Sequence, residues 1–345
     1  MSLQTFEDVK DYYGNVLATN EDLKTSACCP LEAPPKIVQS LLKNVHPTVQ
    51  AKFYGCGSPL PSVAEGKTVL DLGCGSGRDA YLLSQIVGEN GQVIGVDMTN
   101  EQLSVANQHI AWHMNKFDYK KPNVKFVKGY IEDLKTAGIA DNSIDIVISN
   151  CVINLSPDKE KVFSEIYRVL KPGGELYFSD VFAGRRIPKA LQTDKVLLGE
   201  CLGGAMYTED FRRMMTQIGM PDTRITSKRQ LTLDDTDVQQ KAGMIDFYSI
   251  TVRAFKVDLE DLCEDYGHVA YYQGSIAEFP HSFELDDHHT FKTGMPVPVC
   301  GNTANMLLQT RFKDHFKVTG DFSTHYGVFN CAPVVQTGTT TGGCC

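Results

Sequence analysis

Short apolar, β-prone runs alternate with segments of helical periodicity through the middle of the chain. The runs that predict strands are residues 68–72, 93–97, 123–128, 144–149 and 175–180. Between them apolar residues recur at helical spacing, as in residues 80–87 after the first run. Strands that alternate with helices form a parallel sheet covered by helices on both faces. We therefore predict an α/β fold with a doubly wound, Rossmann-like sheet that binds ligands at the carboxyl ends of its strands.

The segments on either side of this alternation are more mixed. Residues 6–50 show helical spacing interrupted by prolines, which predicts a helical N-terminal cap. Residues 247–256 predict a further strand, which we expect to be the antiparallel edge strand of the sheet. We place a domain boundary near residue 257, although a boundary near residue 225 also fits.

This boundary divides the chain into three predicted parts. Residues 1–257 form the main domain, and the short strands predicted within residues 258–331 form a small C-terminal α+β domain. The end of the chain, residues 332–345, is Thr- and Gly-rich and carries cysteines, and we expect it to be disordered.

Length and charge narrow the classes of function. A chain of 345 residues fits two domains, because domains of about 100–150 residues are common. The net charge of −9 argues against broad nucleic-acid binding, which requires neutralisation of phosphates. No apolar run approaches the roughly 20 residues that span a bilayer, and the N-terminus lacks the pattern of a signal peptide. We expect a cytoplasmic protein without nucleic-acid or membrane partners.

The turn after the first strand has the composition of a cofactor-binding loop. Asp71 is followed by Gly73, Gly75 and Gly77 at alternate positions, and glycine lets the backbone turn tightly and approach a ligand. A dinucleotide fingerprint would need a glycine in place of Arg78. A carboxylate at Asp71 would repel phosphate but could hold the ammonium of an amino-acid group. The alternative is a tight structural turn that binds nothing.

A second acid strengthens the prediction of a cofactor site. Asp97 ends the second strand and suits the two ribose hydroxyls of an adenosyl group. Together with Asp97, the glycine loop resembles motif I of class I S-adenosylmethionine (SAM)-dependent methyltransferases. We expect the loop to line the methionine end, Met98 to pack on adenine, Ile131 and Glu132 to flank it, and Asn150 to point at the sulfonium region. For the residues outside the loop, the alternative is a strand-end group satisfied by the backbone.

Cysteines define a second candidate site. The chain has 11 cysteines, and in a reducing compartment a disulfide framework is not expected; no Cys/His spacing fits a structural zinc site. Cys56, Cys151 and Cys201 lie in loops or at strand ends near the predicted ligand edge. An oxygen or nitrogen acceptor would need a general base, and none stands out, whereas thiolates suit a soft acceptor. The alternative is that these cysteines are small buried apolar residues.

The segments around these cysteines resemble the arsenite methyltransferase family. The segments that carry the likeness are residues 54–57, 71–79, 149–155, 174–181 and 199–205. The resemblance covers about residues 7 to 255 and continues faintly to about 318. It implies an enzyme that uses SAM to methylate arsenite and its methylated trivalent products, with trivalent arsenic held by the thiolates of Cys56, Cys151 and Cys201. It also implies that Tyr54 contacts the cofactor.

The same resemblance implies redox chemistry. It implies that Cys28 forms a disulfide relay with Cys56, which thioredoxin or glutathione must reset. Cys29 follows Cys28 directly, so either thiol could react, and the cysteines at 344 and 345 could pass arsenic inward or be a surface pair. Two other functions fit the same residues: a methyltransferase for an organic acceptor such as a quinone or sterol, and a thiol-rich metal- or dinucleotide-binding protein without catalysis.

Overall fold

The structure of the chain is a computed structural model. It describes residues 35–53, 55–194, 197–198, 201–233 and 235–331. Several residues named above therefore lie outside the described residues, namely Cys28, Cys29, Tyr54, the first part of the predicted N-terminal cap and the cysteine-bearing tail 332–345. Among the described residues, no helix is both long enough and apolar enough to cross a membrane.

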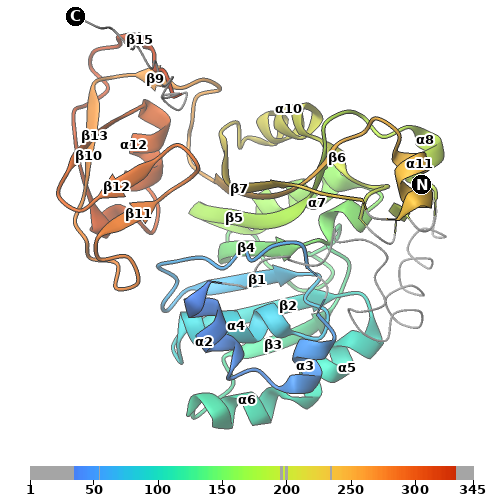
Figure 1. Cartoon of the computed structure of the whole chain (residues 1–345). Coiled ribbons are helices and arrows are strands. Elements are labelled where there is room, and N and C mark those ends of the chain that lie inside the picture. The colour runs from blue at the N-terminus through green and yellow to red at the C-terminus, as the bar shows by residue number, and fades with distance from the viewer. Residues whose placement is uncertain (1–34, 54, 195–196, 199–200, 234, 332–345) are drawn as a thin grey trace, which may run out of the picture.

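An eight-stranded sheet forms the larger part of the molecule (Figure 1). Its order is β3-β2-β1-β4-β5-β8-β7, with β6 paired to β5. The strands from β3 to β5 are parallel to one another, which confirms the predicted α/β sheet. The strands are β1 (Thr68–Leu72), β2 (Gln92–Asp97), β3 (Val124–Lys128), β4 (Ile144–Asn150), β5 (Leu170–Ala183), β6 (Met206–Tyr207), β7 (Thr223–Gln230) and β8 (Phe247–Phe255).

The position of β8 corrects one prediction. β8 is antiparallel to β5, as expected, but it is not the edge strand because β7 pairs with its outer side. Eight of the nine residues of β8 are buried, whereas most of β7 is half-buried or exposed and carries Lys228 and Arg229. A strand that is apolar on both faces needs a neighbour on each side, and a polar, charged strand tolerates the edge.

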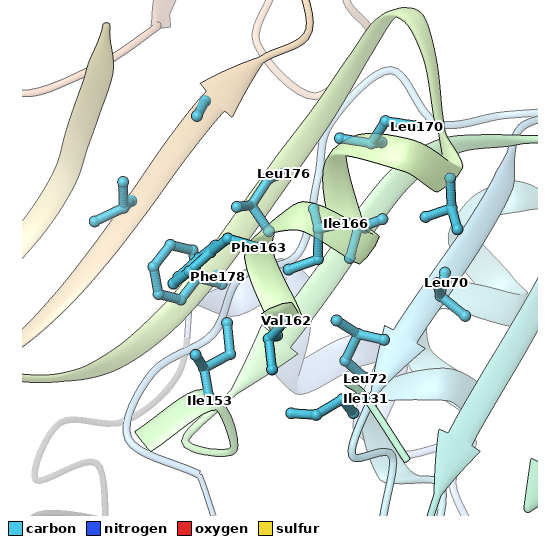
Figure 2. Close-up of a cluster of buried hydrophobic side chains, with 14 of the residues drawn as sticks. Leu70, Leu72, Ile131, Ile153, Val162, Phe163, Ile166, Leu170, Leu176 and Phe178 are labelled. Carbon is cyan, nitrogen blue, oxygen red and sulfur yellow. The ribbon is translucent and has the colours of Figure 1, made fainter. Parts of the chain in front are cut away.

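Helices cover both faces of the sheet. The helices of this part are α2 (Lys36–Leu42), α3 (Pro47–Ala51), α4 (Arg78–Val87), α5 (Asn100–Gln108), α6 (Ile110–Phe117), α7 (Lys159–Val169), α8 (Lys189–Gln192), α10 (Thr208–Ile218), α11 (Thr236–Ala242) and the 3₁₀ helix η4 (Ile153–Leu155). Because side chains alternate along a strand, Val69 of β1 packs with α2 and α4 while Leu70 packs with α7 on the other face. Figure 2 shows this second face, where Phe163 of α7 lies against Phe178 of β5 with ring centroids 5.7 Å apart.

The C-terminal part forms its own small sheets and its own core. Its elements are β9 (Glu264–Asp265), β10 (His268–Tyr272), β11 (Ser282–Glu284), β12 (Thr290–Lys292), β13 (Pro296–Val299), α12 (Gly301–Leu308), the 3₁₀ helix η5 (Lys313–His315), β14 (Phe316–Thr319) and β15 (Gly327–Val328). Figure 1 shows this unit, in orange to red, beside the main sheet. Its apolar cluster begins at Phe255 and Val257. Because the separate core begins at these residues, we propose a domain boundary near residue 257.

A buried ion-pair triad links the C-terminal unit to the main sheet. Glu175 of β5 is fully buried and pairs with Arg253 of β8 (Nε to Oε1, 2.7 Å) and with Arg311, which follows α12. Arg253 also donates to the carbonyl of Leu285 in the C-terminal unit. Two arginines around one carboxylate therefore fix how the unit sits against the sheet.

Replacing Glu175 with Gln is expected to destabilise the protein by about 3–5 kcal/mol, because it leaves two buried guanidinium groups without their counter-charge. Denaturant unfolding would measure the loss. The matched control is Asp210→Asn, which breaks the exposed pair with Arg186 and should change the free energy of unfolding by at most about 1 kcal/mol. Equal losses in the two variants would contradict a structural role for the triad.

Candidate active site

A cavity opens at the carboxyl ends of β1, β2 and β4. The strand order reverses between β1 and β4, and ligands of doubly wound sheets bind at such a reversal. Most of the predicted cofactor residues line this cavity, namely Asp71, Gly73, Gly75, Asp97, Met98, Ile131, Glu132 and Asn150. The edge of the sheet where ligands were expected is thus the edge that carries the cavity.

Two carboxylates, the buried Asp71 and the half-buried Asp97, shape the cavity. Asp97 accepts the backbone N–H of Gly75 (2.9 Å) with one oxygen and that of Thr99 (2.8 Å) with the other, which leaves a lone pair on each oxygen for ribose hydroxyls. Asp71 has one buried oxygen, Oδ2, without a hydrogen-bond partner among the described residues. Burial raises the pKa of both groups, and the charges of Asp79 and Asp97 raise that of Asp71 further.

These carboxylates fit the amino-acid and ribose parts of SAM. An unpartnered, buried carboxylate oxygen is costly unless a cationic donor meets it, and the ammonium of a methionine moiety is such a donor. Beside it, Gly75 has a φ of +51° and open space where a Cβ would stand, so the backbone itself forms the wall. The residues present therefore match the predicted cofactor.

The three glycines of the loop have different tasks. Gly73 has a φ of +67°, and its missing Cβ would lie 2.4 Å from the side chain of Val152, so the loop packs closely on the residue after Cys151. Gly77 was expected to line the cofactor site with the other two glycines, but it is not among the residues that line the cavity. It caps α4 in a left-handed conformation, where a Cβ would lie 2.8 Å from Phe126.

Asn150 has a second task besides facing the cavity. Its side-chain oxygen accepts the N–H of Gly57 (3.2 Å), and its nitrogen donates to the carbonyl of Gly57 (2.9 Å) and to Asp79 (2.9 Å). The carbonyl of Cys56 accepts a hydrogen bond from Ser249 (2.9 Å). Asn150 therefore clamps the loop that carries Cys56 onto the end of β4, a positioning role that the sequence did not indicate.

The three predicted thiol residues converge beside the cavity. Cys56 and Cys151 are joined in a disulfide with their Cα atoms 5.8 Å apart, and the Cys201 sulfur lies 3.4 Å from the carbonyl oxygen of Cys151. All three are buried, and Cys151 also lines the cofactor cavity. The pairing of Cys56 with Cys151 was not predicted. The predicted pairing of Cys28 with Cys56 stays a prediction because Cys28 lies outside the described residues.

Backbone strain marks two of these cysteines. Cys151 has a φ of 58° and Cys201 a φ of 62°, in the left-handed region that side chains with a Cβ rarely adopt. Such conformations cost of order 1–3 kcal/mol and cluster at functional sites, where the surrounding structure enforces them. The N–H of Cys151 donates to the carbonyl of Ser179 (2.9 Å), which holds this conformation against β5.

Asp180 is a site residue that the sequence reasoning missed. One of its oxygens and the sulfurs of Cys56 and Cys151 all lie within 4.8 Å of one another. Burial raises the pKa of Asp180 to about 7, although backbone N–H groups of Val181 and Asn154 oppose the rise. The feature that could have identified Asp180 is the register of the neighbouring parallel strands β4 and β5. Asn150 pairs with Ser179, so the next residues, Cys151 and Asp180, lie opposite each other. A carboxyl group that titrates near neutral pH is placed to accept a thiol proton.

Replacing Asp180 with Asn should change how stability depends on pH. With a folded pKa of about 7 against an ordinary 3.8, the folded wild type binds more protons than the unfolded chain between these values. Its free energy of unfolding should therefore fall as pH rises through this window, by at most roughly 1.4 kcal/mol per pH unit, and level off above it. As the pH rises from 4 to 8, the urea midpoint of wild type should fall relative to the midpoint of Asp180→Asn.

Asp133, which is half-buried in the turn after β3, supplies a control whose pKa shift has the opposite sign. Hydrogen bonds from Thr136 lower the pKa of Asp133, so Asp133→Asn should lose rather than gain relative stability as pH rises. A constant difference between wild type and Asp180→Asn across the window would contradict a raised pKa at Asp180.

Comparison with known proteins agrees with this geometry. Residues 64–219 match a methyltransferase domain family, and residues 266–345 match the family described as the arsenite methyltransferase C-terminal domain. The sheet order, the glycine loop and the two acids around the cavity define a class I SAM-dependent methyltransferase. This excludes the alternative of a dinucleotide-binding protein without catalysis.

Within that class, the chain belongs to the arsenite methyltransferase family. It is 52% identical over 324 residues to the arsenite methyltransferase of Aquipseudomonas alcaligenes, which covers 94% of this chain and 93% of that protein. It is 43% identical over 316 residues to that of Homo sapiens, with coverage of 90% and 83%. The crystal structure of an arsenic(III) S-adenosylmethionine methyltransferase from Chlamydomonas reinhardtii matches with a TM-score of 0.84 at 50% identity, over 86% of this chain and 100% of that one.

Proposed function

We propose that the chain transfers methyl groups from SAM to trivalent arsenic bound by Cys56, Cys151 and Cys201, and that it acts on arsenite and on its methylated trivalent products. The observation that carries the proposal is the convergence of these three cysteines at the wall of the cofactor cavity, with Cys151 shared by both sites. Membership of the arsenite methyltransferase family supports the choice of substrate.

The thiolates prepare arsenic as a nucleophile. Each thiol that binds arsenite replaces a hydroxide and releases a water molecule, so three thiolates leave arsenic with a lone pair and no bound water. The buried walls around Cys151 and Cys201 keep solvent away from that lone pair. Asp180 is placed to take a proton from a thiol and pass it to the departing hydroxide, which leaves as water while the arsenic–sulfur bond forms. Holding the acceptor in one orientation supplies much of the rate in a methyl transfer.

The cofactor is held by the residues around the cavity. SAM, when bound, supplies an electrophilic methyl group and leaves as S-adenosylhomocysteine. Asp71 would hold its ammonium, Asp97 its ribose hydroxyls, and the turn with Ile131 and Glu132 its adenine. We also place Tyr54 at the cofactor, as the family resemblance implies.

Redox chemistry completes the cycle. A methyl group added to a tris-thiolate of arsenic makes arsenic formally pentavalent with one positive charge. Two of its sulfurs can then leave as a disulfide, which returns two electrons to arsenic, and water or another thiol fills the vacated place with loss of a proton. We propose that Cys28 relays with Cys56, and that thioredoxin or glutathione in the reducing cytosol resets the thiols. The Cys56–Cys151 disulfide must likewise be reduced before arsenite can use both sulfurs.

The proposed activity is tested by incubating the reduced protein with arsenite, SAM and thiols and separating the arsenic species formed. We expect methylated arsenicals to appear together with S-adenosylhomocysteine. An organic-acceptor methyltransferase of the quinone or sterol type would instead keep its activity on an organic substrate after its thiols are alkylated. No methylated arsenical with the intact, reduced protein would overturn the proposal.

Separate substrates distinguish the relay from the arsenic ligands. Replacing Cys28 with Ser should abolish repeated turnover on arsenite but spare the single step that starts from methylarsenite, because the relay thiol is needed only to reset the enzyme between turnovers. The matched control is Cys29→Ser, which decides which of the adjacent thiols is the relay. Equal losses on both substrates in the Cys28 variant would contradict this division of tasks.

A further inference from the structure

A second group of three cysteines meets in the C-terminal unit, away from the cavity. The sulfurs of Cys263, Cys300 and Cys331 all lie within 4.8 Å of one another, and none of them forms a disulfide. Cys300 is fully buried, whereas Cys263 and Cys331 are half-buried. The chemistry described above uses none of these thiols.

The fold brings these cysteines together from three separate segments. β9 and β15 pair antiparallel, with Glu264 opposite Val328, and the N–H of Phe329 donates to the carbonyl of Cys263 (2.7 Å). This pairing carries Cys331 back toward Cys263. Cys300 comes from a third segment as the residue that caps the N-terminus of α12. The cluster is therefore fixed by backbone pairing and by a helix cap.

Positive groups converge on the Cys300 sulfur. It accepts the N–H of Thr303 (3.4 Å) and lies 3.8 Å from Nη2 of Arg224. Arg224 is buried and is held in place by ion pairs with Asp222 (2.6 Å) and Asp286 (3.0 Å). A guanidinium and the N-terminus of a helix both stabilise a thiolate over a thiol, and the thiolate is the form that binds soft ions.

The donor set indicates the class of ligand. Zinc in structural sites takes four ligands, whereas the described residues supply three sulfurs within reach of one another. Trivalent arsenic takes three sulfur ligands in a pyramid, with a lone pair at the fourth position. Three thiols and arsenous acid give a neutral tris-thiolate and three waters, without a change of oxidation state. Three thiolates also suit other soft, thiophilic ions.

We propose that Cys263, Cys300 and Cys331 form a second trithiolate site, which binds a trivalent arsenical independently of the catalytic thiols. The choice of arsenic rests on the proposed function, while the existence of a thiophilic site rests on the cysteine geometry alone. The site would hold arsenic in the C-terminal unit while the catalytic site is oxidised or occupied.

Arsenic stoichiometry tests the proposal. The full chain is reduced, incubated with arsenite in the presence of glutathione and gel-filtered, and arsenic per chain is measured by mass spectrometry. Cys263→Ser and Cys331→Ser should each bind one equivalent less than wild type, and Cys201→Ser should lose a different equivalent, so that the Cys201/Cys263 double variant loses two. X-ray absorption of the arsenic retained by Cys201→Ser should show three sulfur neighbours.

The control keeps the sulfurs but alters their surroundings. Thr303→Val removes the hydroxyl next to Cys300 without removing a sulfur, and it should retain the full number of equivalents. Unfolding midpoints show whether each variant folds. If Cys263→Ser does not fold, Cys331→Ser tests the same site, because both sulfurs are needed for it.

The possible outcomes separate the two proposals. Wild-type stoichiometry in both Cys263→Ser and Cys331→Ser would overturn the second site. Zinc that co-purifies with wild type and is lost in these two variants would overturn the assignment to arsenic. A full complement of arsenic in Cys201→Ser, with one equivalent lost in Cys263→Ser, would support the second site while contradicting the proposed catalytic one.

Discussion

Cys201→Ser is expected to lose methylation of both arsenite and methylarsenite, by roughly three orders of magnitude or more, because the acceptor is no longer held in line with the methyl group. Cys201 is fully buried, and its sulfur lies 3.4 Å from the carbonyl of Cys151. A serine hydroxyl has nearly the same shape, but it is a hard, weakly acidic donor that binds arsenic poorly. Separation of arsenic products after single incubations measures the loss.

The accompanying measurement is SAM binding by calorimetry, which should be unchanged in Cys201→Ser. Cys201 is not among the residues that line the cofactor cavity, so a loss confined to turnover identifies it as an arsenic ligand. Cys151→Ser should lose turnover equally, although it borders both sites. More than a tenth of wild-type activity in Cys201→Ser would contradict its role as a ligand.

Asp97→Ala is expected to weaken SAM binding by about a hundredfold or more. The substitution removes the charged acceptor for the ribose hydroxyls, and hydrogen bonds to charged groups are worth about 1.5–3 kcal/mol each. Asp97 also accepts the backbone N–H groups of Gly75 and Thr99, so the loop loses the contacts that hold it in place for the cofactor. Each 1.4 kcal/mol is a factor of about ten in the dissociation constant. Calorimetric titration with SAM measures the change.

Arsenic binding separates this effect from general unfolding. Asp97→Ala should keep the number of arsenic equivalents that wild type binds, because no thiol is altered. Asp133→Ala, which removes an acid that follows β3 and does not line the cavity, should leave both affinities unchanged. A SAM affinity within about threefold of wild type in Asp97→Ala would contradict the assignment of the ribose site.

The positions of the core strands along the chain and the residues proposed for the cofactor site could be predicted because local sequence specifies them. Apolar runs bounded by turn residues define β1 to β5, and the acids Asp71 and Asp97 follow from their places at strand ends. Parallel strands share one carboxyl edge, so residues at strand ends were expected to meet, and the cavity lies at that edge. The edge position of β7 was missed because strand pairing depends on contacts remote in sequence.

Other features depend on which distant segments touch. The approach of Asp180 to Cys151 follows from the register of β4 and β5, and the clamp of Asn150 on the Cys56 loop joins residues 93 positions apart. The meeting of Cys263 with Cys331 depends on the pairing of β9 with β15. None of these has a period or motif in the sequence, because each is a contact between short, irregular segments.

The sequence by itself determined the class of sheet, the position of the cofactor loop and the identity of three of the thiols, because periodicity and residue chemistry are local properties. Only the tertiary structure decided the left-handed backbone at Cys151 and Cys201 and the Cys56–Cys151 disulfide. It also decided the raised pKa of Asp180 and the meeting of the three cysteines in the C-terminal unit. These depend on burial and on distances between remote segments, which arise only when the chain packs around one core.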